Sequence, residues 1–202
     1  MNSVKRDVRG WTLGLASIWD MRAKLAWEVR SFRHLARNPV ATGPDFRTGD
    51  DQGMLFAAAN AFSTAWHLTD WLAFHADADD LWGAISKVAG RPVADRKKLK
   101  EWILTIDPMR LCFAICVATK HVGVSDPALR DMNLEVPVFF DFHVPKSVAA
   151  GPVYAVRNVY LTTESGGVNF TQTVANALGD LELWWDWFLH EAAVPQYPPF
   201  VN

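Results

Sequence analysis

Residues 54–75 read Met54-Leu-Phe-Ala-Ala-Ala-Asn60-Ala-Phe-Ser63-Thr64-Ala-Trp-His67-Leu-Thr-Asp70-Trp-Leu-Ala-Phe-His75. The stretch is largely apolar, and five of its polar residues recur at steps of three and four, which places them on one face of an α-helix. These five residues, the polar stripe, are Asn60, Ser63, Thr64, His67 and Asp70. An exposed stripe is usually rich in Lys, Glu and Arg, but this one offers hydroxyls, an amide, one imidazole and one carboxylate. We therefore expect it to form the wall of a pocket or a buried polar contact between helices.

The composition is that of one large globular domain. The chain has 202 residues, of which 50% are hydrophobic and 21% charged, and 10 Trp and 12 Phe predict a bulky core. No apolar run reaches the length of about 18 residues that a membrane-spanning helix requires. The apolar stretch over residues 12–19 is short, is followed at once by charged residues and has no clear cleavage site, so it resembles a signal peptide only superficially and we expect a cytoplasmic protein. Cys112 and Cys116 lie four apart in an apolar run, a spacing that suits a disulfide poorly on a helix. We interpret them as small buried hydrophobic residues of a protein in a reducing compartment.

Hydrophobic periodicity predicts helices along most of the chain, separated near the end by strands. The helices are expected over 17–37 with Ser17 as its cap, from 50 or 51 to 75, over 79–88, from about 94, from Pro108 to about 122, and over 171–193. Alternating residues predict strands over 134–144 and 153–162, a turn at 164–167 and a brief third strand at 168–170. Pro137 favours an edge position for the first strand.

The predicted fold is therefore mainly α. We expect a single antiparallel helical bundle over residues 1–202, in which residues 134–170 insert a small antiparallel β-hairpin or three-stranded sheet before the C-terminal helix. Every residue from 111 to 118 is apolar, so the helix that contains them should be the most buried.

Charge is distributed unevenly along the chain. The net charge is −2, yet residues 1–40 carry eight Lys or Arg and three Asp or Glu. Four arginines of the first helix, Arg22, Arg30, Arg33 and Arg37, are expected on neighbouring positions of its surface. A basic helix favours an anionic partner such as RNA, with Arg30 and Arg33 as candidate contacts. In the alternative interpretation these arginines are simply solvated on the outer face of the helix.

Two residues at the end of the buried helix are candidates for chemistry. His121 titrates near neutral pH and is a candidate general acid or base, while Lys120 can stabilise negative charge that develops on a phosphate. His67 is a second candidate catalytic imidazole, and Asn60, Thr64 and Asp70 are candidates for binding the substrate. In the alternative interpretation, Lys120 and His121 only stabilise the C-terminus of their helix.

A metal site is a third and weaker interpretation. His67, Asp70 and His121 together would supply two imidazoles and a carboxylate, the ligand set of non-haem iron sites. The sequence has no Glu-x-x-His pair, and nothing in it places His121 beside His67. Our preferred interpretation therefore includes no metal and no cofactor.

The segments Ala-Trp-His67-Leu-Thr-Asp70-Trp and Thr-Lys120-His121, with a closing helix rich in Trp and Phe, resemble uncharacterised bacterial proteins related to the HEPN superfamily. The resemblance covers residues 17–122 and 171–193. It implies a compact bundle of four or five helices, a possible homodimer, and a metal-independent ribonuclease or RNA-binding protein of a bacterial defence or toxin–antitoxin system. Some members of the superfamily are not catalytic.

The sequence departs from this superfamily at its catalytic motif, an Arg followed four to six residues later by His. The nearest Arg before His121 is Arg110, about three helical turns away, so only His121 carries over. The first functional hypothesis is accordingly a HEPN-like protein that binds or cleaves RNA. The alternative is a non-catalytic interaction or accessory protein in which the polar stripe has a structural role.

Overall fold

A computed structural model of the chain describes residues 15–37, 51–120, 132–135, 138–143, 154–165 and 168–196. The protein is a mainly α-helical bundle, as predicted. Its helices are α1 (Ile18–Arg37), α2 (Asp51–Asp79), α3 (Trp82–Ala89), α4 (Arg96–Ile103), α5 (Asp107–Lys120) and α6 (Val174–Glu191).

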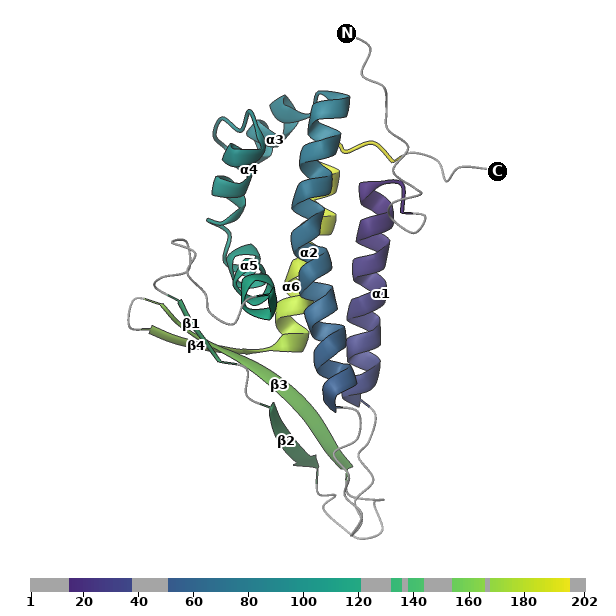
Figure 1. Cartoon of the computed structure of the whole chain (residues 1–202), viewed down its shortest axis with the longest axis vertical. Helices are drawn as coiled ribbons and strands as arrows, with labels where there is room; N and C mark the ends of the chain where they lie inside the picture. The colour runs from purple at the N-terminus through teal and green to yellow at the C-terminus, as the bar shows by residue number, and fades with distance from the viewer. Residues whose placement is uncertain are drawn as a thin grey trace, which may run out of the picture.

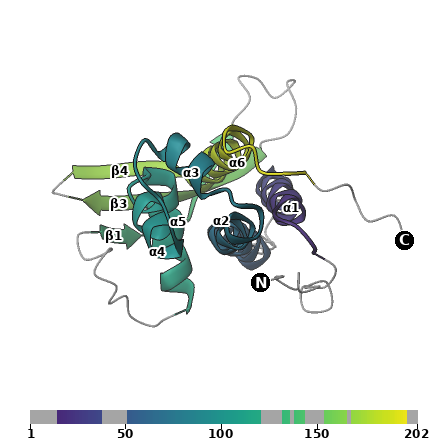
Figure 2. The same cartoon turned by 90° about the horizontal axis from the view of Figure 1, so that it is seen from above.

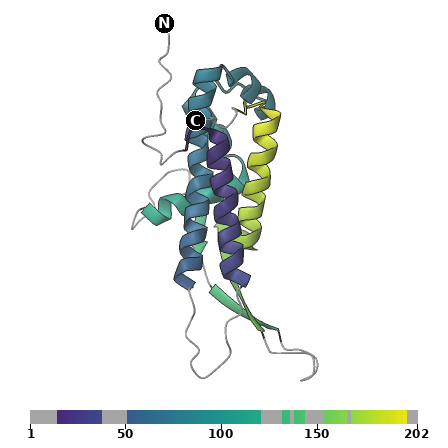
Figure 3. The same ribbon diagram turned by 90° about the vertical axis from the view of Figure 1, so that its right-hand side faces the viewer.

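The three long helices α1, α2 and α6 lie side by side along the long axis of the molecule (Figures 1 and 3). Seen from above, they occupy the corners of a triangle, and α3, α4 and α5 lie beside α2 and α6 (Figure 2). One hydrophobic core joins them, and its largest fully buried side chains include Trp185, Phe32, Phe62 and Phe188. The indole nitrogen of Trp185 donates to the carbonyl oxygen of Ala65 at 3.0 Å, which ties α6 to the middle of α2.

Helix starts follow the capping residues. The backbone N–H of Asp20 donates to Ser17 Oγ at 3.1 Å, and the backbone N–H of Ser17 donates to Asp20 Oδ2 at 2.9 Å, a reciprocal cap that confirms the predicted start of α1. Asp95 accepts from the N–H of Lys98 at the start of α4, and Thr173 caps α6. Each side chain satisfies a helix N–H that would otherwise lack a partner.

Helix α2 continues one turn beyond the predicted end at His75. The ring of His75 is buried; its Nε2 accepts from the N–H of Ile18 at 3.3 Å, and its Nδ1 lies 3.1 Å from Asp79 Oδ2. His75 therefore holds the last turns of α2 against the start of α1. The helix expected over 79–88 begins only at Trp82, because α2 extends to Asp79 and the backbone turns at Asp80, where φ is 55°.

The strands are β1 (Met132–Glu135), β2 (Val138–His143), β3 (Tyr154–Ser165) and β4 (Val168–Thr173). The strands β1, β2 and β4 each pair with β3 in the antiparallel direction. Glu135 pairs with Thr162 and Val138 with Val159, so the register does not change between β1 and β2. These two segments act as one strand along one edge of β3, and β4 lines the other edge. The predicted three-stranded arrangement is thus present, with its first strand in two segments on either side of residues 136–137.

The sheet connects directly to the bundle. Thr173 is both the last residue of β4 and the N-cap of α6, so no linker separates sheet and helix. The long strand β3 contacts α1 as well as α6, below the bundle in the orientation of Figure 1. In the part of the chain that the structure describes, no helix is long and apolar enough to cross a membrane.

The two cysteines are free and buried on α5, as predicted. Cys112 Sγ donates to the carbonyl oxygen of Phe62 at 3.0 Å, and Cys116 Sγ lies 3.9 Å from Ser63 Oγ. Burial raises the pKa of the Cys112 thiol well above its usual value, and the neighbouring Cys116 raises it further. Both thiols therefore serve as packing groups between α5 and α2.

We expect neither thiol of the folded protein to react with a disulfide reagent such as Ellman's reagent at pH 8, because the thiolate is the reactive form and burial opposes it. Unfolding in guanidinium chloride should release both thiols at once. Rapid stoichiometric reaction of the native protein would show that α5 is not packed as described.

Candidate functional site

The polar stripe of α2 does not form a single surface. Thr64 is buried, and its Oγ1 accepts from Lys24 Nζ of α1 at 2.5 Å. The same ammonium group pairs with Glu28, which is also buried. Ser63 instead faces α5, where it meets Cys116. Adjacent residues of the stripe thus contact different helices, and Thr64 belongs to the α1–α2 contact.

The outer members of the stripe lie at the surface. Asn60 and Asp70 are exposed and His67 is half-buried. The expectation of a buried polar contact is therefore wrong for Asn60 and Asp70. The physical reason is that α1 and α5 cover α2 from two directions and leave a strip of α2 open to solvent.

The predicted catalytic group cannot be assembled from the described part of the chain. His121 lies outside it, and Lys120 is the last residue of α5, with its side chain likewise outside the description. His67, which is half-buried on α2, has an interaction of its own within the protein. Among the described residues, no group of three or more His, Cys, Asp or Glu can hold a metal ion.

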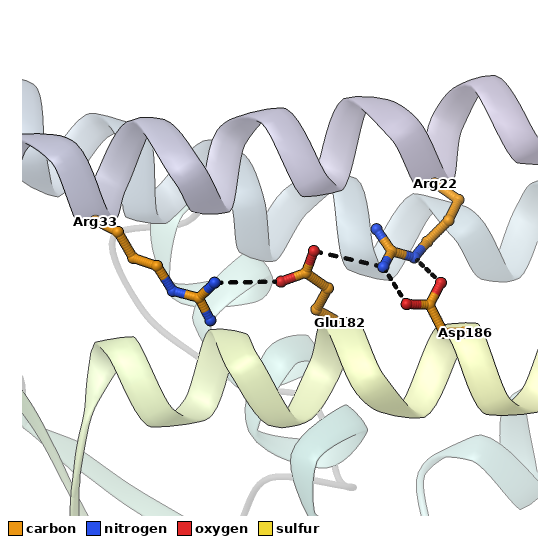
Figure 4. A network of polar contacts seen from close by, with 4 residues as sticks. All are labelled: Arg22, Arg33, Glu182 and Asp186. Carbon is orange, nitrogen blue, oxygen red and sulfur yellow. Dashed lines mark hydrogen bonds and ion pairs between the residues drawn. The ribbon is translucent and has the colours of Figure 1, made fainter.

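Arg22 and Arg33 of α1 pair with carboxylates of α6 (Figure 4), and the side chain of Arg37 lies outside the described part of the chain. Arg22 is buried and makes a two-pronged contact with Asp186, with Nε–Oδ1 and Nη2–Oδ2 distances of 2.6 and 2.5 Å. Glu182 lies between the arginines, 3.4 Å from Arg22 Nη2 and 3.6 Å from Arg33 Nη1. The expectation that these arginines are solvated is wrong for Arg22, because α6 supplies its partners inside the bundle.

Gly179 of α6 lies against the Arg33 guanidinium. A Cβ atom at this position would lie 3.2 Å from Arg33 Nη2, so the end of the Arg33 side chain would have to shift by a few tenths of an ångström. Arg33 is therefore bound to the neighbouring helix, although it was a candidate for contacting RNA.

Arg30, by contrast, is exposed. It lines a surface hollow of about 400 Å³ together with Trp27, Ser31, His34 and Leu35 of the same helix. The side chain of Trp27 is large, yet 62% of its surface is exposed. Of the two predicted RNA contacts on α1, the described structure thus leaves Arg30 at the surface.

A basic surface that the sequence analysis missed lies on α4 and just before it. The residues that form it, the α4 basic patch, are Arg91, Arg96, Lys97, Lys98 and Lys100, all exposed. Helix α4 buries Leu99, Trp102 and Ile103 on its inner face, so the cations are held outward. The run Arg96-Lys97-Lys98-Leu99-Lys100 was the available signal, but charge summed over all residues after 40 is negative and concealed it.

Three of these cations act electrostatically on the neighbouring Glu101. Lys98 Nζ donates to Glu101 Oε2 at 2.8 Å, and this hydrogen bond, with the charges of Lys98, Lys97 and Arg91, lowers the pKa of Glu101. Arg96 is 3.9 Å from Asp77, with both side chains largely exposed. Residues 91–101 contain five cations and two carboxylates, Asp95 and Glu101, and Asp77 adds a third carboxylate, so the surface remains positive.

No family model, no curated protein and no solved structure matches this chain. The α4 basic patch and the hollow on α1 are therefore interpreted from their own residues and geometry alone.

We expect Arg22→Ala to destabilise the fold by about 1–3 kcal/mol, because it leaves Asp186 and Glu182 without their shared cation at the α1–α6 contact. The expected loss of stability is smaller than for a fully buried ion pair, because the side chain of Asp186 is 44% exposed. Urea unfolding followed by circular dichroism gives the difference. The matched variant Arg30→Ala should change stability by less than about 0.5 kcal/mol. Equal effects of the two substitutions would contradict the assignment.

Proposed function

We propose that this protein binds nucleic acid, with RNA as the expected partner, through the α4 basic patch. One observation carries the proposal: five exposed cations gather on one short helix and its approach in a chain whose net charge is −2. A nucleic-acid backbone presents regularly spaced negative charges, and cations that neutralise them release bound counterions. A local positive surface on an otherwise acidic protein favours such a partner and orients its approach.

The construction of α4 supports this role. Its inner face is fixed by Leu99, Trp102 and Ile103, and the ring of Trp102 contacts Trp184 and Phe188 of α6 at centroid distances of 6.2 and 5.4 Å. The cations are thus presented from a firmly packed helix. Contacts of this kind position a nucleic acid without reading its sequence.

The same proposal extends to kinship and location. It describes a cytoplasmic protein that is HEPN-like and able to form a homodimer, as the resemblance carried by residues 65–71 and 119–121 implies. Ribonuclease activity at His121, with Lys120 and His67, is the finer form of the proposal. Incubation with total RNA beside a His121→Ala variant tests it, and cleavage that survives the substitution would remove His121 from the mechanism.

A non-catalytic accessory protein is the second candidate function. It is favoured by the engagement of Arg22, Arg33 and Thr64 inside the bundle, where they bind α6 and α1 in a structural role. Under this candidate the polar residues of the helices stabilise the fold, and the surfaces bind another protein.

We expect Lys97→Gln combined with Lys98→Gln to weaken binding to a fluorescein-labelled RNA at 50 mM salt. If both cations contact phosphates, the slope of log K against log salt should become shallower by about 1.4–1.8, since each contact contributes about 0.7–0.9. Fluorescence anisotropy over several salt concentrations measures both quantities.

The control is Lys97→Arg with Lys98→Arg, which keeps the charges and should retain the slope of the unmodified protein. An unmodified protein that does not bind RNA at low salt would refute the proposal and leave the accessory role. Binding that is equally strong in the glutamine variant would exclude the α4 basic patch as the contact surface.

A further inference from the structure

The hollow on α1 combines three chemically distinct groups on one helix face. Trp27, Arg30 and His34 follow one another at steps of three and four residues, so their side chains lie above one another along the helix surface. The hollow of about 400 Å³ is also lined by Ser31 and Leu35. The hollow is wide open to solvent, so a ligand would lie against the helix face without being enclosed.

The ionisable side chains of this hollow have no partner among the described residues. In the described part of the chain, Arg30 and His34 form no ion pair or hydrogen bond, unlike Arg22 and Arg33 on the same helix. The described lining residues include no carboxylate. Arg30 is exposed, so within the described structure its positive charge faces solvent, where an anion can reach it.

The aromatic group of the hollow is also exposed. Trp27 exposes 62% of its surface, compared with 48% for Trp187 and 8% for Trp102. An exposed indole presents a flat apolar face on which a planar ring can stack. A carboxylate or an inorganic phosphate would satisfy Arg30 but would leave this face uncovered.

The hydroxyl of Ser31 adds a directional constraint. Ser31 Oγ donates its proton to the carbonyl oxygen of Trp27 at 2.9 Å. What it offers to a ligand is therefore an acceptor, and a sugar hydroxyl is a suitable donor.

We propose that the α1 hollow binds a single nucleotide unit. The base stacks on Trp27, the phosphate binds the Arg30 guanidinium with the His34 ring beside it, and a ribose hydroxyl donates to Ser31. The source is either a free nucleotide or an unpaired nucleotide of a strand. The site goes beyond the proposed function and does not depend on it, because it shares no residue with the α4 basic patch.

The test uses the full chain with ¹⁵N-labelled tryptophan, whose indole N–H resonances are followed by NMR; Trp27→Phe assigns the Trp27 signal. Four probes are titrated separately: AMP, adenosine, inorganic phosphate and a hexauridylate. AMP or the hexauridylate should shift the Trp27 signal saturably, with adenosine weaker and inorganic phosphate without effect. Arg30→Gln should weaken AMP binding about tenfold while leaving adenosine unchanged, because it removes a charge-assisted contact to the phosphate alone.

A shift with AMP and the hexauridylate alike assigns the site to nucleotides in general, and a shift with the hexauridylate alone assigns it to strands. No shift with either, or a shift with inorganic phosphate alone, overturns the proposal. Trp187→Ala is the matched control, because Trp187 is 48% exposed on α6 and should leave the Trp27 response unchanged. The two proposals can fail separately. If the Lys97 and Lys98 glutamine variant loses RNA binding but the Trp27 signal does not respond to any probe, the α1 site is refuted and the α4 basic patch is retained.

Discussion

The burial of α2 is the constraint on which the rest of this fold depends. The helix carries Leu, Ala, Phe and Trp on most of its circumference, so neighbours must cover it from several directions. Helices α1, α5 and α6 pack against it, and α4 adds a further contact. A bundle around one central helix is the direct solution, because each surrounding helix needs only one apolar stripe while α2 contributes apolar surface to all of them.

This arrangement determines what happens to the polar residues between helices. Around a central helix, the outer helices meet one another along edges that include polar positions, and α1 meets α6 where Arg22 and Arg33 face Glu182 and Asp186. A cation buried at such an edge requires a paired anion. The positive charge that makes α1 look like an RNA-binding helix in the sequence is thus partly neutralised within the fold, and Arg30 differs because it faces solvent.

Much of the architecture could be predicted from the sequence because it depends on local signals. Ser17 and Asp20 define a cap within four residues, and the alternation in β2 and β3 gives strands without any knowledge of their partners. The end of α2 was predicted too early because His75 is polar and looks like a residue at a helix end. In the structure His75 is buried, and its ring accepts a hydrogen bond from the N–H of Ile18. That bond joins residues 57 positions apart, so no local pattern contains it.

The candidate site was harder to predict for a related reason. Periodicity shows that Ser63 and Thr64 share a region of α2, but it does not show that α5 covers one and α1 the other. The summed net charge of the residues after 40 is negative, so it also conceals a basic helix of eight residues. The exposure of Trp27 follows a similar logic: aromatic residues are expected in the core, and only packing shows which of them the core does not need. The residues left over after α2 has been covered, such as Arg30, Trp27 and the cations of α4, are consequently those on which the functional argument rests.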